Sequence, residues 1–315
     1  MPFSALSVRL AMAATAALLA GGLSSACGSA ETPARAAGFQ AQVRHVRVNG
    51  TSLAYYERGR GPVLLMNMGS ASTMAEWDPA LLRALSARHR LILYDYRGIG
   101  RSSANGLRGL TMARLADDAA ALLRALHIRQ ASVLGWSLGG FVSQQLAIRH
   151  PGLVARLILA GTNPGGSKAV LGPEWAQRID SEQGESDATA LRVLFPPGAR
   201  GRAAGRRFLQ RVERAAETGE IPDDFTVPRR GFEAQLAAEE RWMASDANLR
   251  GLARVRAPTL VTGARLDVLT PPANDAVIAG AIPGARRALY RDGGHAFLFQ
   301  FHGPFGRSAN QFLAG

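Results

Sequence analysis

The sequence predicts an α/β fold: a mostly parallel sheet that opens with an N-terminal antiparallel hairpin and is interrupted by a helical insertion. Short, continuously apolar segments recur along the chain, and such segments suit parallel strands that are covered on both faces. Amphipathic segments with helical periodicity separate them, as expected for strand–helix alternation. One long helix-prone stretch, residues 165–254, breaks the alternation.

The first predicted element is the hairpin. Residues 43–48 and residues 52–57 have the composition of strands, and Asn49 and Gly50 lie between them. Asparagine followed by glycine is typical of the tight two-residue turn that joins antiparallel strands. We therefore expect two paired strands at the start of the folded chain.

The remaining strands are predicted from apolar runs that are too short for helices. They cover residues 63–68, 91–94, 131–134, 157–160, 259–262 and 286–290. Between them, residues 112–126 and 140–149 have helical periodicity, and the second helix should end before Pro151.

The chain divides into four predicted segments. Residues 1–39 form a leader and tether, residues 40–164 the first part of the core, residues 165–254 a helical cap, and residues 255–315 the second part of the core. The cap segment is rich in Arg and Glu and is interrupted by several prolines. Strand character resumes directly after Pro258, which places the cap between two strands of one sheet.

The leader has the layout of an export signal. Arg9 precedes an apolar run over residues 10–20, and small residues continue to Cys27. The run is shorter than the about 20 residues that a membrane span needs. Cys27 is the only cysteine, so no intramolecular disulfide can form, and its place after Ala26 resembles a bacterial lipoprotein cleavage site. We expect export, either with membrane attachment through lipid on Cys27 or by plain secretion, and an uncleaved anchor is a third reading.

The net charge and the positions of the histidines and the cysteine bear on whether the protein binds nucleic acid or a metal. The net charge is +13, but Lys168 is the only lysine, so arginine carries nearly all of the basic charge. The densest basic stretch, residues 200–211, lacks the interleaved aromatic side chains that stack on bases, and we predict no nucleic-acid partner. The six histidines are scattered and the cysteine lies in the leader, so we predict no metal and no cofactor.

A candidate nucleophile follows the third predicted parallel strand. Gly135, Ser137 and Gly139 form a Gly-x-Ser-x-Gly pattern that ends an apolar strand and opens a helix. Glycines on both sides remove side chains that would collide in so tight a turn, which holds the hydroxyl above the sheet edge. The pattern alone is weak evidence, because the chain contains 35 glycines. Whether Ser137 is a nucleophile therefore depends on a base and an acid elsewhere in the chain.

A serine hydroxyl is a poor nucleophile until a base accepts its proton. His295 lies on a glycine-rich loop after the last predicted strand, and Asp267 lies on the loop after the preceding strand. Loops at the same edge of a sheet can bring both side chains over the serine. Taken singly, Asp267 also reads as a helix cap and His295 as a loop-filling residue.

These residues, in the order Ser137, Asp267, His295, resemble the catalytic set of the α/β-hydrolase superfamily, in the serine-nucleophile branch that carries a cap domain. The likeness extends from about residue 40 to the end. The segment from Asp95 to Ser102 is similar to the family's Asp-x-Arg-Gly-x-Gly-x-Ser loop.

The resemblance also implies an oxyanion hole. Its donors would be the backbone N–H groups of Ser70 and Leu138, with Gly69 and Trp136 beside the substrate. In the family a histidine precedes this glycine, whereas this chain has Met68. Backbone donors do not need that histidine, but the hydrogen bonding that fixes the loop is put in doubt.

The function implied by the resemblance is hydrolysis of a small ester, lactone or related acyl substrate through an acyl-enzyme. Ser137 excludes the branches that use an aspartate nucleophile. A carbon–carbon bond hydrolase, a cofactor-free haloperoxidase, an acyl transferase and a non-catalytic binding protein of the same fold stay open. Pocket walls are expected among the large apolar residues of the cap: Trp175, Leu194, Phe195, Phe208, Phe225, Phe232 and Trp242.

Overall fold

The computed structural model describes residues 39–184 and 186–315. The predictions of an export leader and of a lipidated Cys27 concern residues outside this range. Within it, no helix is long and apolar enough to cross a bilayer.

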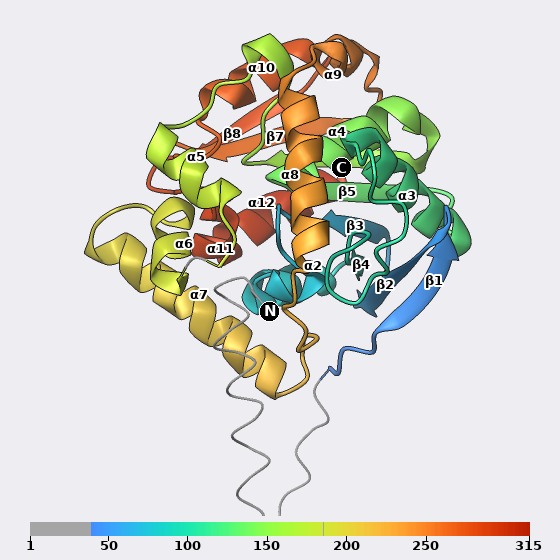
Figure 1. The fold of residues 1–315 in the computed structure, drawn as a ribbon, viewed down its shortest axis with the longest axis horizontal. Coiled ribbons are helices and arrows are strands. Elements are labelled where there is room, and N and C mark those ends of the chain that lie inside the picture. Colours follow the sequence, from blue (N-terminus) through green and yellow to red (C-terminus); the bar gives the residue numbers. More distant parts are fainter. Residues whose placement is uncertain (1–38, 185) are drawn as a thin grey trace, which may run out of the picture.

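An eight-stranded sheet forms the centre of the molecule (Figure 1). The strands are β1 (Arg44–Val48), β2 (Thr51–Arg58), β3 (Val63–Asn67), β4 (Arg90–Tyr94), β5 (Ala131–Trp136), β6 (Val154–Ala160), β7 (Thr259–Ala264) and β8 (Arg286–Tyr290). Their order in the sheet is β1-β2-β4-β3-β5-β6-β7-β8. The first two pairings, β1 with β2 and β2 with β4, are antiparallel, and all others are parallel. The predicted fold class is therefore confirmed.

The hairpin turn has the geometry that its sequence predicts. Asn49 and Gly50 have φ angles of 47° and 73°, so both central residues of the turn lie in the left-handed region. Asn49 also donates from its side chain to the backbone carbonyl of Asp117 at 3.1 Å. This bond fastens the hairpin to a helix of the core.

Helices cover both faces of the sheet, as a parallel sheet requires. One face is covered by α3 (Met112–Ala125), α4 (Leu138–Arg149) and α10 (Ala273–Ala281). The other is covered by α2 (Pro79–Ser86), α11 (Phe297–Gln300) and α12 (His302–Ala314). Short 3-10 turns complete the core at Met74–Glu76, Pro151–Leu153 and Leu252–Arg254.

The segment between β6 and β7 is helical. It contains a 3-10 turn at Gly166–Lys168 and the helices α5 (Glu174–Ser181), α6 (Asp187–Leu194), α7 (Ala199–Glu217), α8 (Arg229–Met243) and α9 (Ala247–Gly251). In Figure 1, α5, α6 and α7 lie together on one side of the molecule, and α8 runs separately from them. The start of α8 touches the core directly, because a Cβ at Gly231 would lie 2.0 Å from the carbonyl oxygen of Gly98.

Candidate active site

Ser137 stands at the turn between β5 and α4. Its backbone angles, φ 56° and ψ −124°, lie in a region that residues with a side chain rarely adopt. The N–H of Ser137 donates to the carbonyl of Ala160 at 3.0 Å, and Thr162 Oγ1 donates to the carbonyl of Ser137 at 2.9 Å. These bonds to the end of β6 hold the strained turn in place.

The two glycines of the Gly-x-Ser-x-Gly pattern are required by close backbone contacts. A Cβ at Gly135 would lie 2.2 Å from the carbonyl oxygen of Gly139, and a Cβ at Gly139 would lie 2.0 Å from the carbonyl oxygen of Asn67. The start of α4 therefore rests directly on the end of β3. This packing brings the loop after β3 against the serine turn.

Asp267 and His295 lie within hydrogen-bonding distance of each other. Asp267 follows β7, His295 follows β8, and His295 Nδ1 is 2.9 Å from Asp267 Oδ2. Three further donors surround the carboxylate: the N–H groups of Leu269 and Thr270 and the hydroxyl of Thr270, each at 2.9 Å. These bonds fix the carboxylate and stabilise its charge.

The environment of His295 favours its protonated form. Burial by itself lowers the pKa of His295, but the charge of Asp267, its hydrogen bond and the charge of Asp180 together raise that pKa above the ordinary 6.5. The ring of Trp136 packs beside the imidazole, with ring centroids 5.2 Å apart, and Trp136 Nε1 donates to the carbonyl of His295 at 3.0 Å. These contacts restrict movement of the imidazole.

The loop after β3, which carries Ser70, packs against the turn that carries Ser137. A Cβ at Gly69 would lie 3.0 Å from the ring of Trp136 and 3.5 Å from Cβ of Ser137. Ser70 N–H makes no backbone hydrogen bond within the described residues. Leu138 is the first residue of α4, a position whose N–H has no acceptor within the helix.

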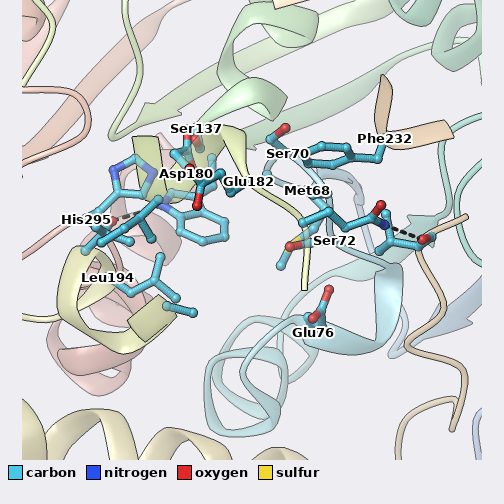
Figure 2. A pocket seen from close by; sticks show the side chains of 18 of the residues that line it. Met68, Ser70, Ser72, Glu76, Ser137, Asp180, Glu182, Leu194, Phe232 and His295 are labelled. Carbon is cyan, nitrogen blue, oxygen red and sulfur yellow. Dashed lines mark hydrogen bonds between the residues drawn. The ribbon is translucent and has the colours of Figure 1, made fainter. Parts of the chain in front are cut away.

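One cavity is lined by both Ser137 and His295 (Figure 2). It is lined by Gly69, Ser70, Trp136, Ser137 and His295 from the core, and the cap closes it from the other side. Much of its wall is apolar, including Met68, Val193, Leu194, Phe208, Phe232 and Phe299. Phe208 and Phe299 stack with their ring centroids 5.1 Å apart, so cap and core meet in this wall.

Of the seven apolar cap residues predicted as pocket walls, Leu194, Phe208 and Phe232 line the cavity. The others do not: Trp175 is 38% exposed at the surface, while Phe195, Phe225 and Trp242 are buried among other side chains. Trp242 stacks on Phe141 of α4 and fastens the cap to the core instead.

Apart from His295, the ionisable side chains that line the cavity in the described part of the chain are acidic: Glu76, Asp180 and Glu182. Burial raises the pKa of Glu76 to about 8. Asp180 is exposed to solvent where it lines the cavity. Glu239 lies next to the cavity, and burial together with the charge of Asp180 raises its pKa to about 8.

Sequence reasoning missed these acidic residues. Asp180 and Glu239 stand on amphipathic cap helices, where a carboxylate is normally a solvated side chain. Only the docking of the cap turns them toward the site. A capping box, in which Thr73 N–H donates to Glu76 at 2.7 Å, could have marked Glu76 as a fixed side chain, but not as a cavity residue.

Residues 62–301, more than half of the chain, match a protein family described as the alpha/beta hydrolase fold. The chain belongs to the α/β-hydrolase family. This α/β-hydrolase is 32% identical over 255 residues to a putative carbamate hydrolase, RutD, of Azorhizobium caulinodans. The aligned region covers 79% of this chain and 90% of the relative.

Two further proteins similar to this α/β-hydrolase have different names. A putative non-heme bromoperoxidase, BpoC, of Mycobacterium tuberculosis is 29% identical over 264 residues, covering 79% of this chain and 92% of the relative. The enol-lactonase of Burkholderia xenovorans superimposes with a TM-score of 0.68 at 25% identity, covering 86% of this chain and all of that structure (100%). Family membership supports an enzyme of hydrolase type, and the variety of these names leaves its substrate open.

Proposed function

We propose that this α/β-hydrolase cleaves an ester, lactone or related acyl compound through a covalent acyl-enzyme. The observation that carries the proposal is the buried contact of 2.9 Å between His295 Nδ1 and Asp267 Oδ2, because His295 lines the same cavity as Ser137. Such a pair orients an imidazole and stabilises its charged form, which an activated serine requires.

The proposed first half-reaction forms the acyl-enzyme. Ser137 Oγ attacks the carbonyl carbon, and His295 accepts the serine proton while Asp267 stabilises the imidazolium. The N–H groups of Ser70 and Leu138 bind the oxyanion of the tetrahedral intermediate, each contributing about 3 kcal/mol of transition-state stabilisation. The intermediate then collapses, and the leaving alcohol takes the proton from His295.

The second half-reaction releases the acid. A water molecule gives a proton to His295 and attacks the acyl carbonyl, and the same donors bind the new oxyanion. Collapse of this intermediate returns the proton to Ser137 Oγ and frees the carboxylic acid. The chemistry needs no group beyond these side chains, backbone donors and water.

The lining of the cavity supports a substrate that is largely apolar and carries no negative charge. Phe208, Phe232 and Phe299 offer contact area for an apolar acyl or alcohol group. Asp180 and Glu182, in contrast, would repel a carboxylate placed beside them. Gly69 and Trp136, which lie against the serine turn, would contact the reacting end of the substrate.

Two measurements test the proposal. A fluorophosphonate should add its mass to the unaltered chain and not to Ser137→Ala, and a panel of p-nitrophenyl esters should be hydrolysed. Absence of labelling would indicate a binding protein. Labelling without any acyl hydrolysis would point instead to the other reactions of this fold, such as carbon–carbon bond hydrolysis.

A further inference from the structure

The middle of the loop that follows β3 is bonded to the cap. Ala71 N–H donates to Gln235 Oε1 at 2.9 Å, and Ser70 Oγ donates to Glu239 Oε1 at 2.5 Å. Gln235 and Glu239 are one turn apart on α8, so they lie on the same face of the helix. One cap helix therefore holds two successive residues of the loop.

The loop is strained where Gln235 holds it. Ala71 has a φ of 49°, in the left-handed region that residues with a Cβ rarely adopt. A conformation of this kind persists only when its surroundings determine it. The bond from Ala71 N–H to Gln235 supplies this constraint at the strained residue itself.

A packing role does not account for Gln235. The residue is fully buried, and its Nε2 has no hydrogen-bond partner within the described residues. Turning the amide over would set Nε2 against the N–H of Ala71, donor against donor, so the loop fixes the amide's orientation. A leucine would fill the space without an unsatisfied donor, and what the glutamine adds is its acceptor for Ala71.

Other contacts hold the ends of the loop but not its middle. At one end, Tyr96 Oη donates to the carbonyl of Met68 at 3.0 Å, and at the other, Thr73 Oγ1 donates to the carbonyl of Asp224 at 2.9 Å. Met68 stands where the family's histidine is expected, and a thioether is at most a weak acceptor. The hydrogen bonding that the sequence left in doubt is thus provided by α8.

We propose that Gln235 and Glu239 are positioning residues: they hold residues 69–72 so that Ser70 N–H faces the carbonyl oxygen of a bound substrate. This inference rests on the proposed acyl-hydrolase function and makes catalysis depend on the docking of α8. Removing either side chain displaces an oxyanion donor and leaves the nucleophile and base unchanged. A loss of this kind lowers kcat and leaves KM unaltered.

The deciding measurement is the rate at which a fluorophosphonate labels Ser137. Intact-mass analysis follows the labelling over time. In this reaction the Ser137 Oγ–phosphorus bond forms, the phosphorus–fluorine bond breaks with release of fluoride, and His295 accepts the serine proton. Negative charge develops on the phosphoryl oxygen between the same two donors. We expect Gln235→Leu and Glu239→Ala to label about ten- to a hundred-fold more slowly than the unaltered chain. Glu239→Gln keeps an acceptor for Ser70 and should label at nearly the unaltered rate.

Gln145→Leu is the matched control. It makes the same chemical change in α4, where it removes a bond of 2.8 Å to Asn248 of α9 and leaves the loop after β3 untouched. It should label at the unaltered rate. With p-nitrophenyl acetate, Gln235→Leu should lower kcat, while KM and the pH at which activity is half-maximal stay as in the unaltered chain.

Each outcome decides the inference. An unaltered labelling rate in Gln235→Leu overturns the role of Gln235, and an unaltered rate in Glu239→Ala overturns the role of Glu239. Either result leaves the proposed nucleophile in place. If the unaltered chain resists labelling, the proposed function fails and the positioning role fails with it. If Gln235→Leu does not fold, the half-buried Glu239 decides: equally slow labelling of Glu239→Ala and Glu239→Gln contradicts an acceptor role, and slow labelling of Glu239→Ala alone supports it.

Discussion

Ser137, the proposed nucleophile, has a strained backbone. Its φ of 56° is costly for any residue with a Cβ, and a strained conformation of this kind costs about 1–3 kcal/mol. Bonds to the end of β6 hold it, so the strain persists whether or not the hydroxyl is present. Substitutions of this residue can therefore remove reactivity without loss of stability.

Two substitutions separate them. Ser137→Ala should abolish ester hydrolysis and fluorophosphonate labelling and leave the fold intact, because the strained backbone stays as it was. Ser137→Gly should be as inactive but more stable than Ser137→Ala by about 1 kcal/mol, since glycine adopts positive φ without strain. Activity assays and urea unfolding check both, and a Gly variant less stable than the Ala variant would argue against strain at this turn.

The pH dependence of activity should report His295. The imidazole accepts a proton only when neutral, and Asp267 raises its pKa above 6.5, so kcat/KM should fall as the pH drops through a value above 6.5. Asp267→Asn removes the charge that raises this pKa, while the burial that lowers it remains. The acid limb should then move to lower pH, and kcat should fall by about four orders of magnitude.

Asp180→Asn is the control for this assignment. Asp180 also raises the pKa of His295, though less than Asp267 does, and it makes no hydrogen bond to the ring. The acid limb should move slightly to lower pH with kcat nearly unchanged. If kcat/KM falls at the same pH in Asp267→Asn as in the unaltered chain, the group that titrates is not His295.

At the scale of the elements, a buried ion pair joins the loop after β4 to α3. Arg97 Nε and Nη2 each donate to a carboxylate oxygen of Asp118 at 2.6 Å, and both side chains are almost fully buried. Arg97 also donates to the carbonyl of Asn105 at 2.8 Å. The pair explains the arginine in the segment from Asp95 to Ser102, since it fixes this loop against the core.

Breaking the pair should destabilise the fold. Arg97→Met removes the buried cation beside Asp118. Among the described residues, the carboxylate then keeps only Asn49 Nδ2 at 3.0 Å and the more distant Arg114 at 3.9 Å. We expect the free energy of unfolding to fall by about 3 kcal/mol. Arg101→Met in the same loop is the control, because Arg101 pairs at the surface with Asp223 and should contribute less than about 1 kcal/mol. Urea denaturation measures the free energy of unfolding of both variants. Similar losses would mean that burial does not determine how much an ion pair contributes to stability.

Local signals carried most of what could be predicted. The strand, the glycines and the helix around Ser137 are neighbours in the chain, and Asp267 and His295 follow strands whose apolar runs are evident. Gln235 and Asp118 could not be assigned in this way. Each stands on an amphipathic helix, and helical periodicity tells which face is buried but not which distant loop it meets.

At the scale of the whole molecule, the site and the surface differ in charge. The chain carries a net charge of +13, while the ionisable residues lining its described cavity are acidic apart from His295. We expect a p-nitrophenyl ester with an anionic acyl group, such as the monosuccinate, to have a kcat/KM about ten-fold or more below that of the neutral butyrate. The gap should widen from pH 7 to pH 9, because Glu76, with a pKa of about 8, then loses its proton.

The double variant Asp180→Asn, Glu182→Gln tests the cause of this selectivity. It should raise kcat/KM for the succinate ester and change that for the butyrate ester little. Equal effects on both esters would show that shape, not charge, sets the preference.

Attachment of the enzyme to a membrane is a separate proposal that rests on the sequence alone. We propose that cleavage before Cys27 leaves a lipidated N-terminus, with residues 28–38 as a tether. Stable anchoring requires two or more acyl chains, because one gives marginal binding. Intact-mass analysis of protein from its native host should show a chain that begins at Cys27 with added lipid mass. A chain that begins beyond Cys27, or at Cys27 without lipid, contradicts the proposal.

The bonds between α8 and the loop after β3 also bear on when the protein becomes reactive during its synthesis. Ser137 leaves the ribosome long before Gln235, and Asp267 and His295 follow later still. Contacts between residues so far apart in sequence form late, because a long loop must close first. A nascent chain that has Ser137 but not yet Gln235 and His295 therefore lacks the bonds that hold Ser70 N–H and lacks the proposed base. On the proposed mechanism, we expect that such a chain is not acylated by cellular esters before it is complete.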